Sequence, residues 1–313
     1  MKYAGIDIGG TKCAVVLGNE KGDILNKVKF DTTTFPETFH QIIAETESMG
    51  KFDAIGISCG GPLDSEKGVI IAPPNLPDWN NVEIVKILNE KFKVPVFLKN
   101  DADACALAEW NFGAGRGTKN MIFLTFGTGM GAGLILNGQL YSGTCDCAGE
   151  IGHIRMTQTG PVGYGKEGSF EGYCSGGGIA QLGKLYIQSK AEMGETVSFC
   201  DKDGKITAKS IAEAAESGNI HAREIYAQCG RMLGKGLSVL IDILNPQKII
   251  IGSIFQRSGH LLRDEMEKEI AKESICWSRN VCKIVPAELG EAIGDKAAIC
   301  VAIYGMKGLN QNG

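Results

Sequence analysis

The sequence predicts an α/β fold made of two similarly organised halves. Each half opens with an apolar run, a glycine turn and a second apolar run, at residues 3–7 and 13–17 and again at residues 121–126 and 133–136. Strand-like runs then alternate with segments of helical spacing, which indicates mixed sheets flanked by helices. A chain of 313 residues is long enough for two domains, each with its own core.

The rest of the first half suits such a sheet. Residues 24–30 add a third strand to the opening pair, and buried strands are expected at 53–58 and 94–98. Helical spacing predicts helices over 35–48, 82–92 and 102–111. In the second half, the Asn137-Gly138 pair predicts a hairpin turn. A glycine-rich irregular stretch then runs to about residue 178. Further helices are expected at 179–193, 207–217, 222–244 and 297–306, and strands at 248–251 and 283–286.

Composition excludes several classes of protein. The formal net charge is −4 and there is no basic run, so the electrostatic footprint of a nucleic-acid-binding protein is missing. No segment has the length of a membrane span, and the first residues lack the apolar stretch of a secretory leader. The 11 cysteines form no regular framework, which favours reduced thiols and a cytoplasmic protein.

Two glycine turns are candidate phosphate sites, because glycine lets several backbone N–H groups point at one anion. They are Gly9-Gly10-Thr11-Lys12 and Gly127-Thr128-Gly129. An acid, Asp7, precedes the first turn, and this is reasonable if Mg²⁺ bridges it to the phosphates. Taken alone, each turn is explained more simply as an ordinary hairpin turn than as a phosphate site. Together, opening two similar halves, they favour a bound nucleotide.

One competing motif involves the second turn. Gly127-x-Gly129-x-x-Ala132 fits a variant of the dinucleotide-binding fingerprint. That fingerprint requires a helix directly after the turn, whereas residues 133–138 predict a short strand and a hairpin. We therefore reject the dinucleotide-binding alternative.

Carboxylates supply the remaining candidates. Asp101 follows an apolar strand and precedes a helix, where it would either accept a proton from an attacking hydroxyl or cap the helix, as Asn100 also would. Glu150, His153 and Glu171 lie in a glycine-rich stretch and offer the donors and acceptors that sugar hydroxyls require. The plainer alternative for these three is a set of solvated loop side chains.

The ordered motifs resemble the ROK family (repressors, open reading frames and kinases), whose members have the actin/hexokinase-like ATPase fold of ribonuclease H-like duplicated domains. The resemblance covers nearly the whole chain. The matching motifs are Asp7-Ile8-Gly9-Gly10-Thr11-Lys12, Gly60-Gly61-Pro62, Pro74-Asn75-Leu76, Asn100-Asp101, residues 125–133, Leu136-Asn137-Gly138, Glu150-Ile151-Gly152-His153 and Gly168-Ser169-Phe170-Glu171.

The resemblance implies a role for each site residue. Asp101 would be the catalytic base. The nucleotide would be held by Asp7, Gly9, Gly10, Thr11, Lys12, Gly127, Thr128 and Gly129, with Gly252 and Ser253 near the adenosine. The sugar would be held by Gly61, Asn75, Asn100, Asp101, Glu150, His153 and Glu171. A smaller lobe would comprise residues 1–113 and 294–313, and a larger lobe residues 114–293.

The chain departs from the family pattern in three places. The family binds a structural zinc through a histidine, here His153, and a Cys-x-Cys-Gly-x-x-Gly-Cys run. Residues 162–169 read Val-Gly-Tyr-Gly-Lys-Glu-Gly-Ser, so all three cysteines are missing. We therefore expect no zinc, and we expect packing of Tyr164 and Phe170 to hold this loop. Asp103 stands where asparagine is common, and Ser253 where a second glycine is common.

These features predict an ATP:hexose phosphotransferase that uses ATP and Mg²⁺, with no metal held by the protein alone. The first expected substrate is glucose or a similar simple hexose, the second is N-acetylmannosamine, and the acceptor is the 6-hydroxyl. The resemblance also implies a homodimer. Only six residues precede Asp7, so we expect no winged helix-turn-helix and no repressor activity. The remaining alternative is a sugar-binding sensor without catalysis.

Overall fold

The computed structural model describes residues 1–312, apart from the side chains of Glu291, Gln311 and Asn312. The chain forms two compact units. The first comprises Met1–Lys119, Gly133–Ala148 and the chain from Glu288 onward, and the second Asn120–Ala132 and Gly149–Ala287. The lobe boundaries expected from the sequence stay a prediction. None of the helices within residues 1–312 combines the length and apolar character that a bilayer crossing needs.

The structure holds two five-stranded sheets of the same design, the first within the first unit and the second mainly within the second unit, with β10 and the end of β9 assigned to the first unit. The first sheet has the order β3-β2-β1-β4-β7 and the second the order β10-β9-β8-β13-β14. In the first, β1, β2 and β3 are antiparallel neighbours, while β4 and β7 continue parallel to β1. In the second, β10 is antiparallel to β9, and β8, β13 and β14 run parallel. This repeated order confirms the expected duplicated α/β fold.

The first sheet and its helices follow the sequence pattern closely. The helix at 35–48 has the expected bounds, and the opening strands form the expected meander. The elements are β1 (Lys2–Ile8), β2 (Lys12–Asn19), β3 (Ile24–Asp31), α1 (Phe35–Ser48), β4 (Ala54–Cys59), β5 (Leu63–Asp64), β6 (Val69–Ile70), α2 (Ile84–Phe92), β7 (Val96–Asn100), α3 (Asp101–Phe112) and, at the end of the chain, η2 (Gly290–Ala292) and α10 (Ile293–Asn312).

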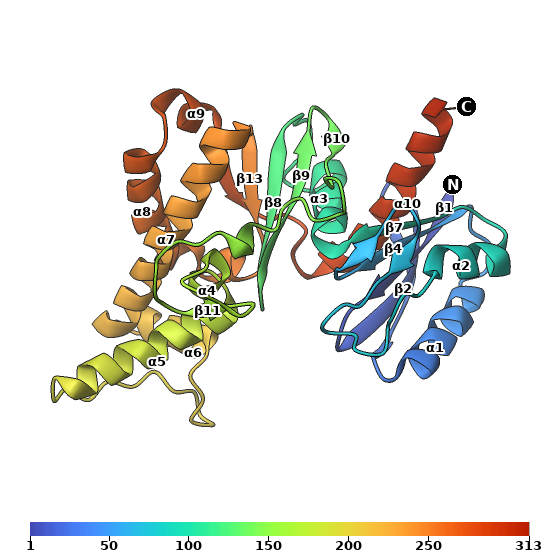
Figure 1. The fold of residues 1–313 in the computed structure, drawn as a ribbon. Coiled ribbons are helices and arrows are strands. Elements are labelled where there is room, and N and C mark those ends of the chain that lie inside the picture. Colours follow the sequence, from blue (N-terminus) through green and yellow to red (C-terminus); the bar gives the residue numbers. More distant parts are fainter. Residues whose placement is uncertain (313) are drawn as a thin grey trace. The chain divides into compact units, whose positions relative to one another are not determined.

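Successive residues of β1 face opposite sides of the first sheet. The core of the first unit therefore has one part on each side of this sheet. Ile6 and Ile8 belong to a buried cluster that includes Ile42 of α1 and Leu88 of α2. Gly5, with the opposite orientation, packs against α10. Figure 1 shows α1 and α2 on one side of this sheet and α10 on the other.

Two glycines let α10 approach the sheet closely. A Cβ on Gly56 of β4 would collide with the backbone oxygen of Ala298, and one on Gly5 would lie 2.8 Å from Val16 and 3.0 Å from Ala298. Ala298 and Ala302 of α10 are themselves fully buried. The last helix of the chain is therefore part of the core built on its first strand.

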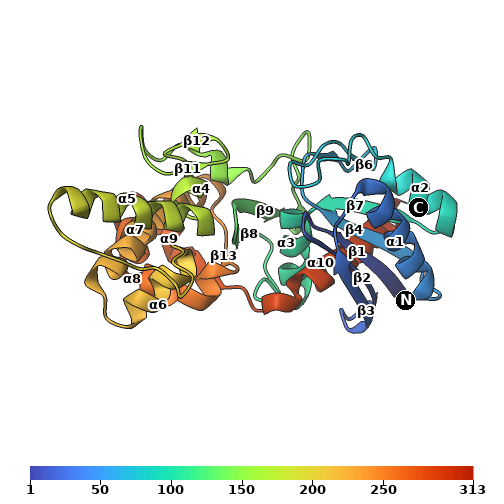
Figure 2. The ribbon, with the colours of Figure 1, turned by 90° about the horizontal axis from the view of Figure 1, so that it is seen from below.

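The remaining elements extend the second sheet or cover it with helices. They are β8 (Met121–Phe126), β9 (Met130–Leu136), β10 (Gln139–Leu140), η1 (Ile151–His153), β11 (Val162–Gly163), β12 (Lys166–Glu167), α4 (Phe170–Tyr173), α5 (Gly176–Glu192), α6 (Ala208–Glu216), α7 (Ile220–Leu244), β13 (Lys248–Ile251), α8 (Ile254–Glu273), α9 (Cys276–Val281) and β14 (Lys283–Pro286). In the view from below, α5, α6, α7 and α8 gather around β13 (Figure 2).

Three sequence expectations need correction. Strand β9 begins at Met130, not at residue 133, because Gly131 and Gly133 continue the extended backbone. The stretch to residue 178 is not wholly irregular, since it holds β10, a short hairpin (β11–β12) and α4. Helix α8 was not predicted. The hairpin at Asn137-Gly138 is confirmed, with φ of 53° and 75° at the two turn residues.

Candidate active site

Three strand ends of the first unit meet at one edge of its sheet. Ile8 is paired in register with Cys59, and Cys59 with Asn100. The carboxyl ends of parallel strands are where open α/β sheets place ligand-binding groups. This register brings together the segments that begin at Gly9, Gly60 and Asn100.

The first glycine turn is closed by its own backbone. The Gly9 N–H donates to the Lys12 carbonyl at 3.2 Å, and the Thr32 hydroxyl donates to the Gly9 carbonyl at 2.6 Å. A Cβ on Gly10 would lie 2.6 Å from the Asn75 Cβ, so this turn touches the loop expected to hold sugar. Thr11 and Lys12 are exposed.

Asn100 takes the helix-capping role that was considered from the sequence. The Asn100 side chain is the N-cap of α3, accepting from the Ala102 N–H at 2.9 Å. A Cβ on Gly61 would lie 3.2 Å from Asn100 Nδ2. Asp101 is the first residue of the helix. Its Oδ1 also accepts from the Ala102 N–H at 2.8 Å, but the residue is exposed rather than sealed in the core. Desolvation by the surrounding protein raises the pKa of Asp101, and the Ala102 hydrogen bond opposes this.

Asp7 lies at the same edge, on β1, and is half-buried. Burial raises the pKa of Asp7 to about 6, and the negative charges of Asp101 and Asp295 act in the same direction. A hydrogen bond to Ser58 opposes the shift. Carboxylate oxygens are ligands that Mg²⁺ takes in proteins, and a cation near Asp7 would relieve this repulsion.

The second unit holds the other glycine turn beside a second strand end. Leu124 of β8 is paired in register with Ile251 of β13, and the Gly252 N–H donates to the Leu124 carbonyl at 3.0 Å. The turn Gly127–Gly129 follows β8 and is followed by strand β9. The strand that was expected after this turn is thus confirmed, and the dinucleotide-binding alternative required a helix there.

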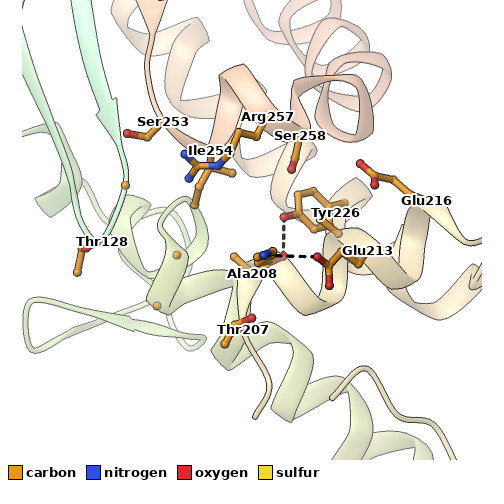
Figure 3. Close-up of a pocket in the computed structure, with 15 residues that line it drawn as sticks. Thr128, Thr207, Ala208, Glu213, Glu216, Tyr226, Ser253, Ile254, Arg257 and Ser258 are labelled. Atoms are coloured by element: carbon orange, nitrogen blue, oxygen red, sulfur yellow. Dashed lines mark hydrogen bonds and ion pairs between the residues drawn. The ribbon is translucent and has the colours of Figure 1, made fainter. Parts of the chain in front are cut away.

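A cavity of about 740 Å³ opens between these strand ends and helices α6, α7 and α8 (Figure 3). Gly127, Thr128 and Ser253 line one end of it. The sequence also pointed to Gly252, which is buried. It did not point to the other lining residues, among them Thr207, Ala208, Lys209, Glu213, Tyr226, Arg257 and Ser258.

Tyr226 builds the wall of this cavity opposite the glycine turn. Its hydroxyl donates to the Ala208 carbonyl at 2.9 Å, which joins α7 to α6, and burial raises its pKa. Residues that line one cavity from three separate helices share no local motif, so no sequence signal would have identified them.

Glu171 ties the glycine turn to the expected sugar loop. Its Oε2 accepts from the Met130 N–H at 3.0 Å, and a Cβ on Gly129 would lie 2.7 Å from the same oxygen. A Cβ on Gly152 would lie 3.3 Å from the Glu171 Cβ. Glu150 is exposed at the start of η1 and His153 is half-buried at its end. The second unit therefore gathers Glu171 with the Glu150–His153 segment.

The loop in which the family resemblance places a zinc motif is a β-hairpin. Val162 pairs with Glu167, and Tyr164 and Gly165 form the turn with φ of 45° and 74°. The Tyr164 ring meets the His153 ring edge to face at 5.0 Å, although Tyr164 is 67% exposed.

Phe170, at the start of α4, is fully buried against Gly236 of α7. Phe170 therefore packs as expected, whereas Tyr164 contributes mainly a ring contact at the surface. Within the described residues, no three His, Cys, Asp or Glu side chains are grouped so as to hold a metal ion.

Comparisons with known proteins agree on one family. The model of the ROK family matches residues 3–303. The chain is 32% identical to a glucokinase of Streptomyces coelicolor over 299 residues, 93% of this chain and 94% of that protein. A crystal structure of a ROK family glucokinase from Streptomyces griseus, in complex with glucose and AMPPNP, superposes with a TM-score of 0.76 at 31% identity, covering 96% of this chain and 99% of that one.

The relatives also include transcription factors. The chain is 28% identical to a xylose repressor of Caldicellulosiruptor bescii, over 96% of this chain and 77% of the repressor. Fold and site together define an α/β protein of the hexokinase-like class. More specifically, the chain belongs to the ROK family.

Proposed function

We propose that the protein transfers the γ-phosphoryl group of ATP to the 6-hydroxyl of a hexose. Glucose or a similar simple hexose is the first substrate and N-acetylmannosamine the second. The observation that carries this proposal is the exposed carboxylate of Asp101, which lies among the strand ends that bear Asp7, Gly61 and Asn100. Glucokinases at 32% identity support it.

Asp101 has the properties of a general base for this reaction. Its raised pKa makes it a stronger proton acceptor than an ordinary carboxylate, and its exposure leaves it accessible to a sugar hydroxyl. As the family resemblance implies, the residues that orient the sugar are Gly61, Asn75, Asn100, Glu150, His153 and Glu171. Phosphoryl transfer depends mainly on positioning and charge neutralisation, so this set is sufficient.

The nucleotide is held by backbone N–H groups and hydroxyls. As the resemblance implies, the phosphates are served by Gly9, Gly10, Thr11, Lys12, Gly127, Thr128 and Gly129, while Gly252 and Ser253 line the adenosine end. Mg²⁺, held near Asp7, neutralises charge on the phosphates when bound. In the AMPPNP complex of the related glucokinase the nucleotide is an ATP analogue, which supports ATP as the donor.

A non-catalytic sugar sensor is the second candidate, and the similarity to a xylose repressor favours it. A single experiment separates the two. ADP formation is measured with a panel of hexoses, and sugar binding is measured separately by calorimetry. A kinase forms ADP with glucose, and Asp101→Asn lowers kcat at least about 100-fold while glucose still binds.

The matched control is Asp53→Asn, an exposed carboxylate before β4, which we expect to retain wild-type activity. Sugar binding without ADP formation by the wild-type protein would instead establish the sensor. Phosphorus NMR of the product identifies the hydroxyl that is phosphorylated.

Two further properties belong to the proposal. The eleven cysteines form no regular framework of spacings, which supports a reducing cytoplasmic location. The expected small-molecule partners are ATP and a small sugar. The expected protein partner is a second copy of the chain, with which it forms a homodimer. Light scattering on the purified protein tests the dimer directly.

A further inference from the structure

A row of paired residues crosses the first sheet at the level of Asp7. Strand pairing aligns one residue from each strand of the sheet there, in the order Lys29, Ala14, Asp7, Ser58 and Lys99. Residues that are paired in register on neighbouring strands project from the same face of a sheet. That face is the one covered by α10, because Gly5, two residues before Asp7, lies against Ala298 of this helix. A lysine therefore stands at each end of the row, with Asp7 at its centre.

The other lysines that the strands present on this face are paired with carboxylates. The pairs, with their nitrogen–oxygen distances, are Lys12–Asp31 (3.7 Å), Lys27–Asp295 (2.6 Å) and Lys99–Asp146 (3.9 Å). Lys29 is exposed, and no carboxylate in the described part of the chain forms an ion pair with it. Its charge therefore differs from the other three in having no ion-pair partner among these residues.

Lys29 lies close to both Asp7 and the first glycine turn. Burial raises the pKa of Asp7, and the positive charge of Lys29 is among the influences that lower it. Lys29 is two residues, about 7 Å along the strand, from Asp31, which is paired in register with Lys12 of the turn. A lysine carries its charge on a flexible four-carbon stem. The ammonium group can therefore reach the anion that the turn would hold.

We propose that Lys29 is a further phosphate-binding residue of the nucleotide site, and that its ammonium group contacts the phosphate chain held at Gly9–Lys12. The inference rests on the proposed function, which gives this turn a nucleotide but gives Lys29 no role. A nucleotide brings negative charge to a position where the Asp7 carboxylate repels it, and a lysine without a carboxylate partner offsets this repulsion. Lys12, the lysine of the glycine motif, shares its charge with Asp31.

Substitutions at two lysines define the test. Lys29→Met removes the charge and keeps a long side chain, and Lys29→Arg restores the charge. Lys51→Met is the matched control. Lys51 is likewise exposed and has no ion pair among the residues that the structure describes, but it precedes β4, at the opposite edge of the same sheet.

Calorimetry in the presence of Mg²⁺ measures the affinity of each variant for ADP and for adenosine. We expect roughly tenfold weaker ADP binding in Lys29→Met, the loss of one contact between charged groups. Adenosine affinity should not change, because adenosine has no phosphate. Lys29→Arg and Lys51→Met should bind ADP with close to wild-type affinity.

A plainer role for Lys29 is to offset the charge of Asp7 without touching a ligand. Asp7→Asn separates the two roles, because asparagine has no charge to offset. If Lys29 contacts phosphate, Lys29→Met weakens ADP binding roughly tenfold in the Asp7→Asn background as well. Loss of the effect in that background would overturn the inference.

Wild-type ADP affinity in Lys29→Met would also overturn the inference, and so would an equal loss of ADP and adenosine affinity. If the wild-type protein forms ADP with a hexose in these cases, the proposed function stands and only the role of Lys29 is lost. If the wild-type protein binds no ADP, both are lost.

Discussion

The carboxylate of Glu109, fully buried in α3, accepts a hydrogen bond from the backbone N–H of Leu289 at 2.9 Å. The same carboxylate accepts from the N–H groups of Ala114 and Glu288. Of the four places where the chain crosses between the units, the first follows Lys119 and the last precedes Glu288. One side chain therefore anchors the segments beside these two crossings to the helix that begins at Asp101.

Replacing Glu109 should destabilise the protein strongly. Glu109→Ala leaves three backbone N–H groups without their acceptor, at a cost of about 3 kcal/mol or more in the free energy of unfolding. Glu109→Gln keeps one acceptor oxygen and should lose about half as much. Urea unfolding measures both. The exposed Glu90 on α2 gives the control, since Glu90→Ala should change stability little; an equally stable Glu109→Ala protein would refute the anchoring role.

Asp103 gives a pH-dependent prediction. It is 2% exposed and accepts from the Ser142 hydroxyl at 2.6 Å. Burial raises the pKa of Asp103 from 3.8 to about 6. The folded protein therefore holds a proton between these two values that the unfolded chain has released, so the free energy of unfolding falls as pH rises through this window.

Asp103→Asn has no charge to bury and keeps an oxygen for Ser142. We expect it to raise stability by about 3 kcal/mol near pH 8 and to change it little near pH 4. Thermal melts across this pH range make the measurement, with the exposed Asp78→Asn as control. If the substitution changed stability equally at both pH values, the charge of Asp103 would not be the cause of the change.

The contact between Gly10 and Asn75 predicts that one substitution affects both substrates. A Cβ at Gly10 would lie 2.6 Å from the Asn75 Cβ and 2.7 Å from its carbonyl oxygen, so Gly10→Ala must displace one of the two loops. We expect KM to rise about tenfold for ATP and for the sugar alike. Gly60→Ala is the matched control, because no atom lies within 4 Å of a Cβ there. A change confined to ATP would mean that Asn75 does not hold the sugar.

Metal analysis tests the expected absence of structural zinc. Val162, Tyr164 and Ser169 stand where the family resemblance leads us to expect cysteines, and the Ser169 hydroxyl accepts from the Gly172 N–H at 3.1 Å. We expect the purified protein to contain far less than one zinc per chain. Dialysis against a chelator should leave its Tm unchanged, and Mg²⁺ alone should restore phosphoryl transfer. One tightly held zinc per chain would contradict the prediction.

The predictable parts of this protein are those that local patterns define. The opening meander, the helix at residues 35–48 and the hairpin at Asn137-Gly138 each depend on neighbours in sequence, and the structure has all three. The register of β7 against β4 then places Asn100 beside the end of β4. An apolar strand that is followed by a polar pair predicts such a position at the edge of the sheet.

The unpredicted parts depend on distant segments. Helix α8 buries Phe255, Leu262, Met266 and Ile270, a stripe of helical spacing that its many charged residues obscured. The cavity wall formed by Tyr226 and the burial of Asp103 arise only from packing. No pattern in the sequence encodes them.

The dependence of the first unit on α10 has a consequence for protein synthesis. The second unit is complete once residue 287 has been translated, whereas β1 and β4 await α10, which is translated after that unit. Strands β1 and β4 are thus translated before the second unit but gain this packing partner only after it. Truncating the protein before residue 293 should leave an N-terminal sheet that recruits chaperones instead of folding.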